Sequence, residues 1–80
     1  SNNSLHLFII YNDIGFTYKE QEDYTKALEF YRKAVDIDEK YLPENHEEIA
    51  TVWSNIGTVY CQQHILDEAL ICFERVTKTH

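Results

Sequence analysis

The stretch YNDIGFTY, at residues 11–18, returns 42 residues later as WSNIGTVY, at residues 53–60. Each copy carries an aromatic residue, an Ile-Gly pair and a tyrosine at spacings of three and four, which places these side chains on one face of an α-helix. Apolar residues coincide downstream at the same offset: Tyr24 with Leu66, Ala27 with Ala69, Leu28 with Leu70, Tyr31 with Phe73 and Ala34 with Val76. The chain therefore contains an internal repeat, and repeats of this length indicate a solenoid.

Each repeat holds two apolar stripes separated by a short polar segment, a pattern that predicts a helical hairpin. Between the repeats, Pro43 ends a helix because proline lacks an amide donor and disfavours helical geometry in the residue before it. Asn45, with Glu48 three residues later, resembles an N-terminal capping pair. We expect an all-α fold of two antiparallel hairpins, with helices at residues 4–20, 24–41, 45–62 and 66–78.

Two glycines lie in the middle of expected helices, where glycine costs about 1 kcal/mol relative to alanine. Close approach of the partner helix is the simplest compensation for Gly15 and Gly57. Ala27 and Ala69 are small for the same reason, since they allow the second helix of each hairpin to lie tightly against the first.

Charge and composition narrow the function classes. Fourteen acidic residues against seven basic ones give a net charge of -7, which repels phosphate backbones and anionic lipid headgroups. The apolar run at residues 7–11 is far shorter than the ~20 residues that span a bilayer. We expect no nucleic-acid or membrane partner, a cytoplasmic location, and reduced thiols at Cys61 and Cys72.

No constellation of residues indicates catalysis or metal binding. Cys61, His64, Glu68 and Cys72 have spacings that would form a metal-binding face on one continuous helix, but the expected turn at residues 63–65 interrupts it. Neither cysteine has a histidine base and an orienting acid at a recognisable spacing. We therefore expect no enzyme activity, no metal and no cofactor.

The repeated residues resemble the tetratricopeptide repeat, whose pattern is an aromatic residue, Leu-Gly and Tyr in the first helix, then Ala, an aromatic residue and Ala in the second. The matching positions are Tyr11, Ile14-Gly15, Tyr18, Ala27, Tyr31 and Ala34 in the first repeat, and Trp53, Ile56-Gly57, Tyr60, Ala69, Phe73 and Val76 in the second. Ile replaces Leu in both copies, and Val76 replaces the last Ala. The resemblance implies that the chain binds protein or peptide partners in a concave groove lined by the first helices.

The repeat is longer than the ~34 residues usual in this family. This length, and the linker at residues 41–46, are similar to the kinesin light chain subgroup. We expect residues 1–80 to form a single domain fragment, with one repeat at residues 4–44 and the other at residues 45–80.

The groove residues implied by the resemblance lie on the first helix of each repeat, away from the stripe that faces the second helix. We assign to the groove Ile9, Asn12, Phe16, Lys19, Thr51, Asn55, Thr58 and Gln62. Asn12 and Asn55 would hydrogen-bond an extended peptide backbone, since an amide both donates and accepts, and Phe16 would supply an apolar anchor. The alternative is that these are solvated residues, with Phe16 packing on an adjacent repeat.

Two repeats are few, because the end units of an array expose the faces that neighbours would cover. The first helix lacks the polar outer face of a terminal cap, so we expect either a longer array or self-association driven by Leu7, Phe8 and Ile10. Two functional classes follow: a peptide-binding scaffold, or a module that forms homo-oligomers, including by exchange of helices.

Overall fold

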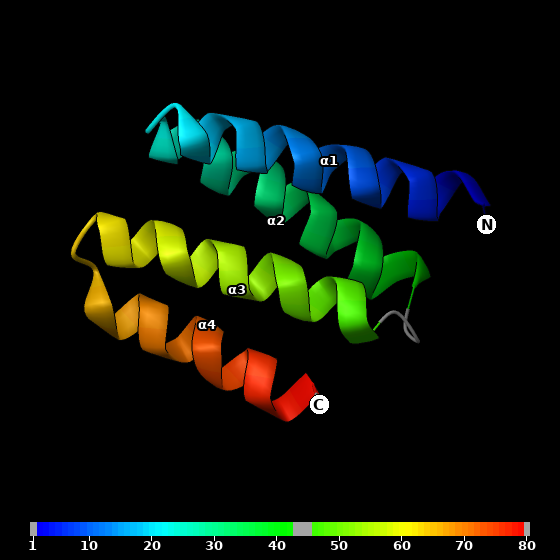
Figure 1. Cartoon of the computed structure of the whole chain (residues 1–80). Coiled ribbons are helices and arrows are strands. Elements are labelled where there is room, and N and C mark those ends of the chain that lie inside the picture. Colours follow the sequence, from blue (N-terminus) through cyan, green and yellow to red (C-terminus); the bar gives the residue numbers. More distant parts are fainter. Residues whose placement is uncertain (1, 43–45, 80) are drawn as a thin grey trace.

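The computed structural model describes residues 2–42 and 46–79, and Figure 1 shows these residues as two antiparallel helical hairpins. The helices are α1 (Asn2–Glu20), α2 (Tyr24–Tyr41), α3 (His46–Gln62) and α4 (Leu66–Thr79). The all-α prediction is confirmed, and every helix end lies within two residues of its expected position. Asn45 of the expected capping pair lies outside the described residues.

The two hairpins turn in the same way. Glu22 (φ 63°) and His64 (φ 65°) adopt the left-handed conformation at equivalent repeat positions. One residue later, the backbone N–H of Asp23 donates to the Tyr18 carbonyl at 2.9 Å, and that of Ile65 donates to the Tyr60 carbonyl at 2.8 Å. These bonds satisfy carbonyls that the end of a helix leaves free, so both first helices end in the same C-terminal motif.

The hairpins differ at the start of their second helices. The Asp23 side chain accepts a hydrogen bond from the backbone N–H of Lys26 at 3.2 Å and so caps α2. The equivalent residue before α4 is Ile65, whose side chain has no acceptor. The N-terminus of α4 therefore lacks the side-chain cap that α2 has.

The glycines lie at tight contacts between the two helices of each hairpin, as expected. A Cβ atom on Gly15 would lie 2.8 Å from the ring of Tyr31, and one on Gly57 would lie 2.7 Å from the ring of Phe73. Aromatic rings of α2 and α4 thus fill the space that a larger residue at these positions would need.

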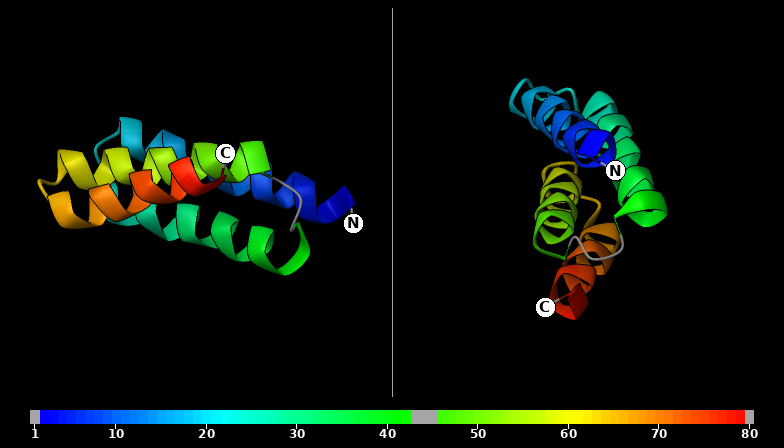
Figure 2. Two further views of the ribbon diagram at one scale, coloured as in Figure 1. Left: turned by 90° about the horizontal axis from the view of Figure 1, so that it is seen from below. Right: turned by 90° about the vertical axis from the view of Figure 1, so that its right-hand side faces the viewer.

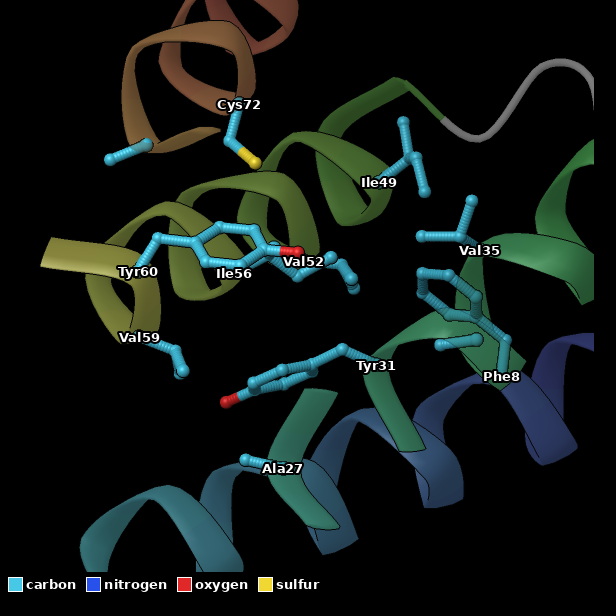
Figure 3. Close-up of a cluster of buried hydrophobic side chains, with 12 residues drawn as sticks. Phe8, Ala27, Tyr31, Val35, Ile49, Val52, Ile56, Val59, Tyr60 and Cys72 are labelled. Carbon is cyan, nitrogen blue, oxygen red and sulfur yellow. The ribbon is translucent and has the colours of Figure 1, made fainter. Parts of the chain in front are cut away.

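The core lies where α3 packs on the first hairpin (Figure 3). Its largest fully buried side chains are Tyr31, Phe8, Val52 and Val59. At the edge of this contact, the guanidinium of Arg32 on α2 donates to the hydroxyl of Tyr60 on α3 at 2.8 Å. Apolar packing and this directed hydrogen bond therefore both help to join the hairpins.

One expectation about α1 was wrong. Phe8, expected to drive self-association, is only 1% exposed and belongs to the core, whereas Leu7 and Ile10 are exposed. Phe8 stands seven residues before Gly15 and so shares the helix face that packs on α2. Leu7 and Ile10 do not belong to the buried core, and 37% and 40% of their surfaces are exposed.

Candidate peptide-binding surface

Two residues assigned to the groove lie side by side. The amide nitrogen Nδ2 of Asn55 on α3 donates to Oδ1 of Asn12 on α1 at 3.4 Å, and both side chains are half-buried. An amide offers two N–H donors and a carbonyl acceptor, so this single bond leaves capacity on both residues. The pair joins α1 and α3 into one surface with unused donors and acceptors.

A hollow of about 410 Å³ adjoins this pair. Thr51, Ser54 and Asn55 supply its polar lining, and Ala50 and Val76 supply apolar lining. Glu47 is the charged residue in the lining, so the hollow offers no cation to a ligand carboxylate. Its chemistry suits a neutral peptide backbone better than a free acid.

The assigned residues of α1 extend this surface away from the hollow. Phe16 is 45% exposed and Ile9 is exposed as well. The Nζ atom of Lys19 lies 4.7 Å from the centre of the Phe16 ring, within the range of a cation–π contact. The ammonium group thus lies over the exposed ring that was expected to anchor a partner.

The remaining two assigned residues contribute less. The Thr58 hydroxyl donates to the Ser54 carbonyl at 3.0 Å within α3, so its donor is already used, as is that of the Thr51 hydroxyl, which donates to the Glu47 carbonyl at 3.3 Å; unlike Thr51, Thr58 is not among the residues that line the hollow. Gln62 is exposed at the end of α3 and is not part of the lining of the hollow. Of the eight assigned residues, Asn12 and Asn55 are hydrogen-bonded to each other, and Thr51 and Asn55 line the same hollow.

A second pocket of about 370 Å³, which was not predicted from the sequence, lies between α2, α3 and α4. Trp53, Tyr60 and Cys72 are among the residues that line it. The repeat itself indicates this pocket, because Cys72 is equivalent to Phe30 at the 42-residue offset and a small thiol there replaces an aromatic ring.

Both cysteines are free thiols, with Cys61 exposed and Cys72 buried. Burial raises the pKa of the Cys72 thiol, the nearby Glu68 carboxylate raises it further, and Arg75 and Arg32 oppose the shift. A thiol with a raised pKa is a weak nucleophile. Within residues 2–42 and 46–79, no three His, Cys, Asp or Glu side chains come close enough to hold a metal ion.

No helix in the described part of the chain has the length and apolar character needed to cross a bilayer. The tetratricopeptide repeat family model matches residues 6–79. Comparisons with curated proteins and with solved structures gave no significant match. The family match spans both hairpins and includes every position of the repeated pattern, so the chain belongs to the tetratricopeptide repeat family.

Proposed function

We propose that this chain is a non-enzymatic scaffold that binds an extended segment of a partner protein along the surface shared by α1 and α3. The contact between Asn12 and Asn55 carries the proposal, because it sets two amide side chains on adjacent helices with donors and acceptors left over. The exposed ring of Phe16 offers an apolar anchor on the same helix as Asn12. Tetratricopeptide repeat domains in general bind proteins or peptides.

The same proposal extends to the organisation of the chain. The equivalent turns at Glu22 and His64 support two repeat units, at residues 4–44 and 45–80. The 42-residue offset supports a place among the long repeats similar to kinesin light chain. A net charge of -7 supports a protein partner in the cytoplasm over nucleic acid or an anionic membrane.

The test begins with selection of peptides that bind the immobilised chain from a random display library. The selected peptide is then titrated against the unsubstituted chain and the double variant Asn12→Ala/Asn55→Ala by calorimetry. Loss of hydrogen bonds at both amides should weaken binding at least tenfold, about 1.4 kcal/mol. Glu29→Gln, an exposed change on α2, is the control and should leave affinity unchanged.

Circular dichroism establishes that the double variant is folded. Full affinity in a folded Asn12→Ala/Asn55→Ala variant would remove the α1 and α3 surface as the binding site. Weaker peptide binding by the single variant Phe16→Ala would support Phe16 as the apolar anchor. Unchanged peptide affinity in this variant would assign Phe16 to the solvated surface.

A second candidate function is head-to-tail self-association, which one observation favours. The residues of α3 packed in the core with α2 include Ile49, Val52 and Ile56. Their equivalents on α1, at the 42-residue offset, are Leu7, Ile10 and Ile14. α1 thus carries the apolar row that α3 uses, and Leu7 and Ile10 of that row are exposed.

The complementary row is on α4. Leu66, Leu70 and Phe73 are equivalent to Tyr24, Leu28 and Tyr31 of α2, and all three are exposed. Figure 2 shows α1 and α4 at opposite ends of the molecule. α1 of a second copy would therefore cover α4 as α3 covers α2, through a heterologous contact that extends into open oligomers.

Paired variants test this second candidate by light scattering during size-exclusion chromatography. Ile10→Glu blocks the α1 face and Leu70→Glu blocks the α4 face, so each alone should be monomeric. A mixture of the two should form a one-to-one complex and nothing larger, because it retains one open face of each kind. Raised salt should strengthen the association, since it screens repulsion between acidic copies.

Matched controls are available on the same helices. Ile9→Glu and Ile71→Glu also place a charge at exposed apolar residues, but their equivalents Thr51 and Glu29 are exposed in the other repeat. Both controls should associate like the unsubstituted chain. An unsubstituted chain that is monomeric at every concentration would exclude self-association.

A further inference from the structure

The first hairpin contains an aromatic cluster centred on Phe30. Its ring stacks on Tyr18, with centroids 5.7 Å apart and planes inclined by 18°, and lies 6.1 Å from the ring of Tyr11. These separations are typical of favourable ring pairs. The ammonium of Lys33 lies 5.9 Å from the centre of the Tyr11 ring. Three rings and one cation thus form a continuous group on α1 and α2.

The second hairpin repeats this group except for its central ring. Trp53 and Tyr60 are equivalent to Tyr11 and Tyr18, and Arg75 is equivalent to Lys33. The Arg75 guanidinium lies 4.6 Å from the centre of the Trp53 ring, so the cation contact is kept. At the position of Phe30 stands Cys72, whose thiol is much smaller than a phenyl ring.

The second pocket lies where the ring is missing. Trp53, Tyr60 and Cys72 line it, together with Ile56 of α3 and Val35 of α2. Figure 3 shows Cys72 on α4 with its sulfur directed toward α3. The volume of about 370 Å³ falls within the range of small-ligand pockets. The apolar lining and this volume suit an aromatic side chain.

Charges of both signs also line the pocket. Arg32 and Arg75 are balanced by Asp36 and Glu68. One N–H of Arg32 is bonded to the Tyr60 hydroxyl, and a guanidinium has five N–H donors. A balanced set of this kind favours a neutral dipolar group, such as a peptide amide, over a free anion or cation.

We propose that this pocket binds an aromatic side chain of a protein partner, which takes the position in the second hairpin that Phe30 takes in the first. The ring would stack on Tyr60 and approach Trp53, as Phe30 does with Tyr18 and Tyr11. This site is separate from the surface of α1 and α3, so it adds an aromatic specificity that the groove proposal does not contain.

The single tryptophan of the chain lies in this pocket and serves as the reporter. N-acetyl-phenylalanine amide is titrated while Trp53 fluorescence and its indole N–H resonance are followed. We expect saturable changes with Kd on the order of 1 mM, as for a ligand of about fifteen non-hydrogen atoms. N-acetyl-alanine amide, which lacks the ring, should produce no saturable change. An equal response to both probes, or an indole resonance that does not move with the phenylalanine probe, would overturn the proposal.

Variants at Cys72 separate ring occupancy from other effects. Cys72→Phe supplies the missing ring from the chain itself and should weaken probe binding at least tenfold, while Cys72→Ala keeps the pocket open and should bind as before. Undiminished binding to a folded Cys72→Phe variant would contradict the proposal. If that variant does not fold, the indole resonance of the unsubstituted chain still decides the site. Asn12→Ala/Asn55→Ala should leave probe binding unchanged, so the groove and the pocket succeed or fail separately.

Discussion

Tyr31 and Phe73 occupy the same position in the two hairpins, but their surroundings differ. Each ring packs against the glycine of its own hairpin. Tyr31 is 0% exposed because α3 covers it, whereas Phe73 on the uncovered face of α4 is 37% exposed. Leu70 on the same face is 60% exposed, and its equivalent Leu28 packs partly buried against the core. In a repeat protein, the neighbouring hairpin therefore decides how much a residue of the repeated pattern contributes to stability.

Removal of the two rings should give the largest difference between the hairpins. Tyr31→Ala should lower the free energy of unfolding by about 3–5 kcal/mol, because it leaves a cavity under α3, whereas Phe73→Ala should cost only about 1–2 kcal/mol. Urea unfolding followed by circular dichroism measures both. If Tyr31→Ala does not fold, Tyr31→Leu and Phe73→Leu keep the comparison. Equal losses of unfolding free energy at the two positions would contradict the explanation that α3 covers Tyr31 whereas the Phe73 face of α4 is uncovered.

Alanine substitution at the glycines should also destabilise the first hairpin more than the second, by a smaller amount than removal of the rings. The Cβ of Gly15→Ala would press on the Tyr31 ring, which α3 holds in place, so we expect a loss of about 1–3 kcal/mol. Gly57→Ala meets the partly exposed Phe73 ring, which has room to move, and alanine favours the helix by about 1 kcal/mol. Its unfolding free energy should therefore stay within about 1 kcal/mol of the unsubstituted chain. Thermal unfolding of both variants compares them, and a larger loss at Gly57 would refute this explanation.

A third difference between the rings is the hydroxyl of Tyr31. It is buried without a hydrogen-bond partner among the described residues, and Phe73 has no such group. Tyr31→Phe should therefore raise the unfolding free energy by about 1 kcal/mol. A loss of stability in urea unfolding would mean that the hydroxyl has a partner after all.

The same hydroxyl should make stability depend on alkaline pH. Burial raises the pKa of Tyr31 to about 12, and the charge of Glu20 adds to this effect. The unfolded chain loses this proton near pH 10 and the folded chain near pH 12, so stability should fall as pH rises between these values. Between pH 9 and 11.5, the free energy of unfolding should fall less steeply with pH in Tyr31→Phe than in the unsubstituted chain. Parallel curves for the two proteins would rule out a contribution from this hydroxyl.

The smallest expected effect concerns the cap that α2 has and α4 lacks. Ile65→Asp introduces an acceptor at the position equivalent to Asp23 and should stabilise α4 by about 0.5–1 kcal/mol. Asp23→Ala should remove a similar amount from α2. Amide hydrogen exchange in the first turn of each helix measures both changes, and unaltered exchange at α4 in Ile65→Asp would show that its N-terminus needs no cap.

Much of the fold followed from the sequence. The repeated pattern at residues 11–18 and 53–60 predicted the hairpins, because its helical period is local and strong. Gly15 and Gly57 correctly marked the close contacts between helices. Side-chain burial on α1 was harder to predict: Phe8 and its neighbours Leu7 and Ile10 are all apolar, and only the direction of α2 and α3 separates them.

The candidate site was predicted only in part. Asn12 and Asn55 were assigned to one surface because each lies off the apolar stripe of its helix, but their contact depends on the angle between α1 and α3, which periodicity does not give. The pocket at Cys72 was missed because it arises from a residue that is absent, and a smaller side chain produces no pattern of its own. Comparison of Cys72 with Phe30 would have indicated it.

The most direct test of the scaffold proposal is chemical-shift mapping of a library-selected peptide on the isotope-labelled chain. The side-chain amide resonances of Asn12 and Asn55 and the backbone amide resonance of Thr51 should shift on binding, with little change on the exposed face of α4. Shifts confined to α2 and α4, with both asparagine amides unmoved at saturation, would contradict the scaffold proposal.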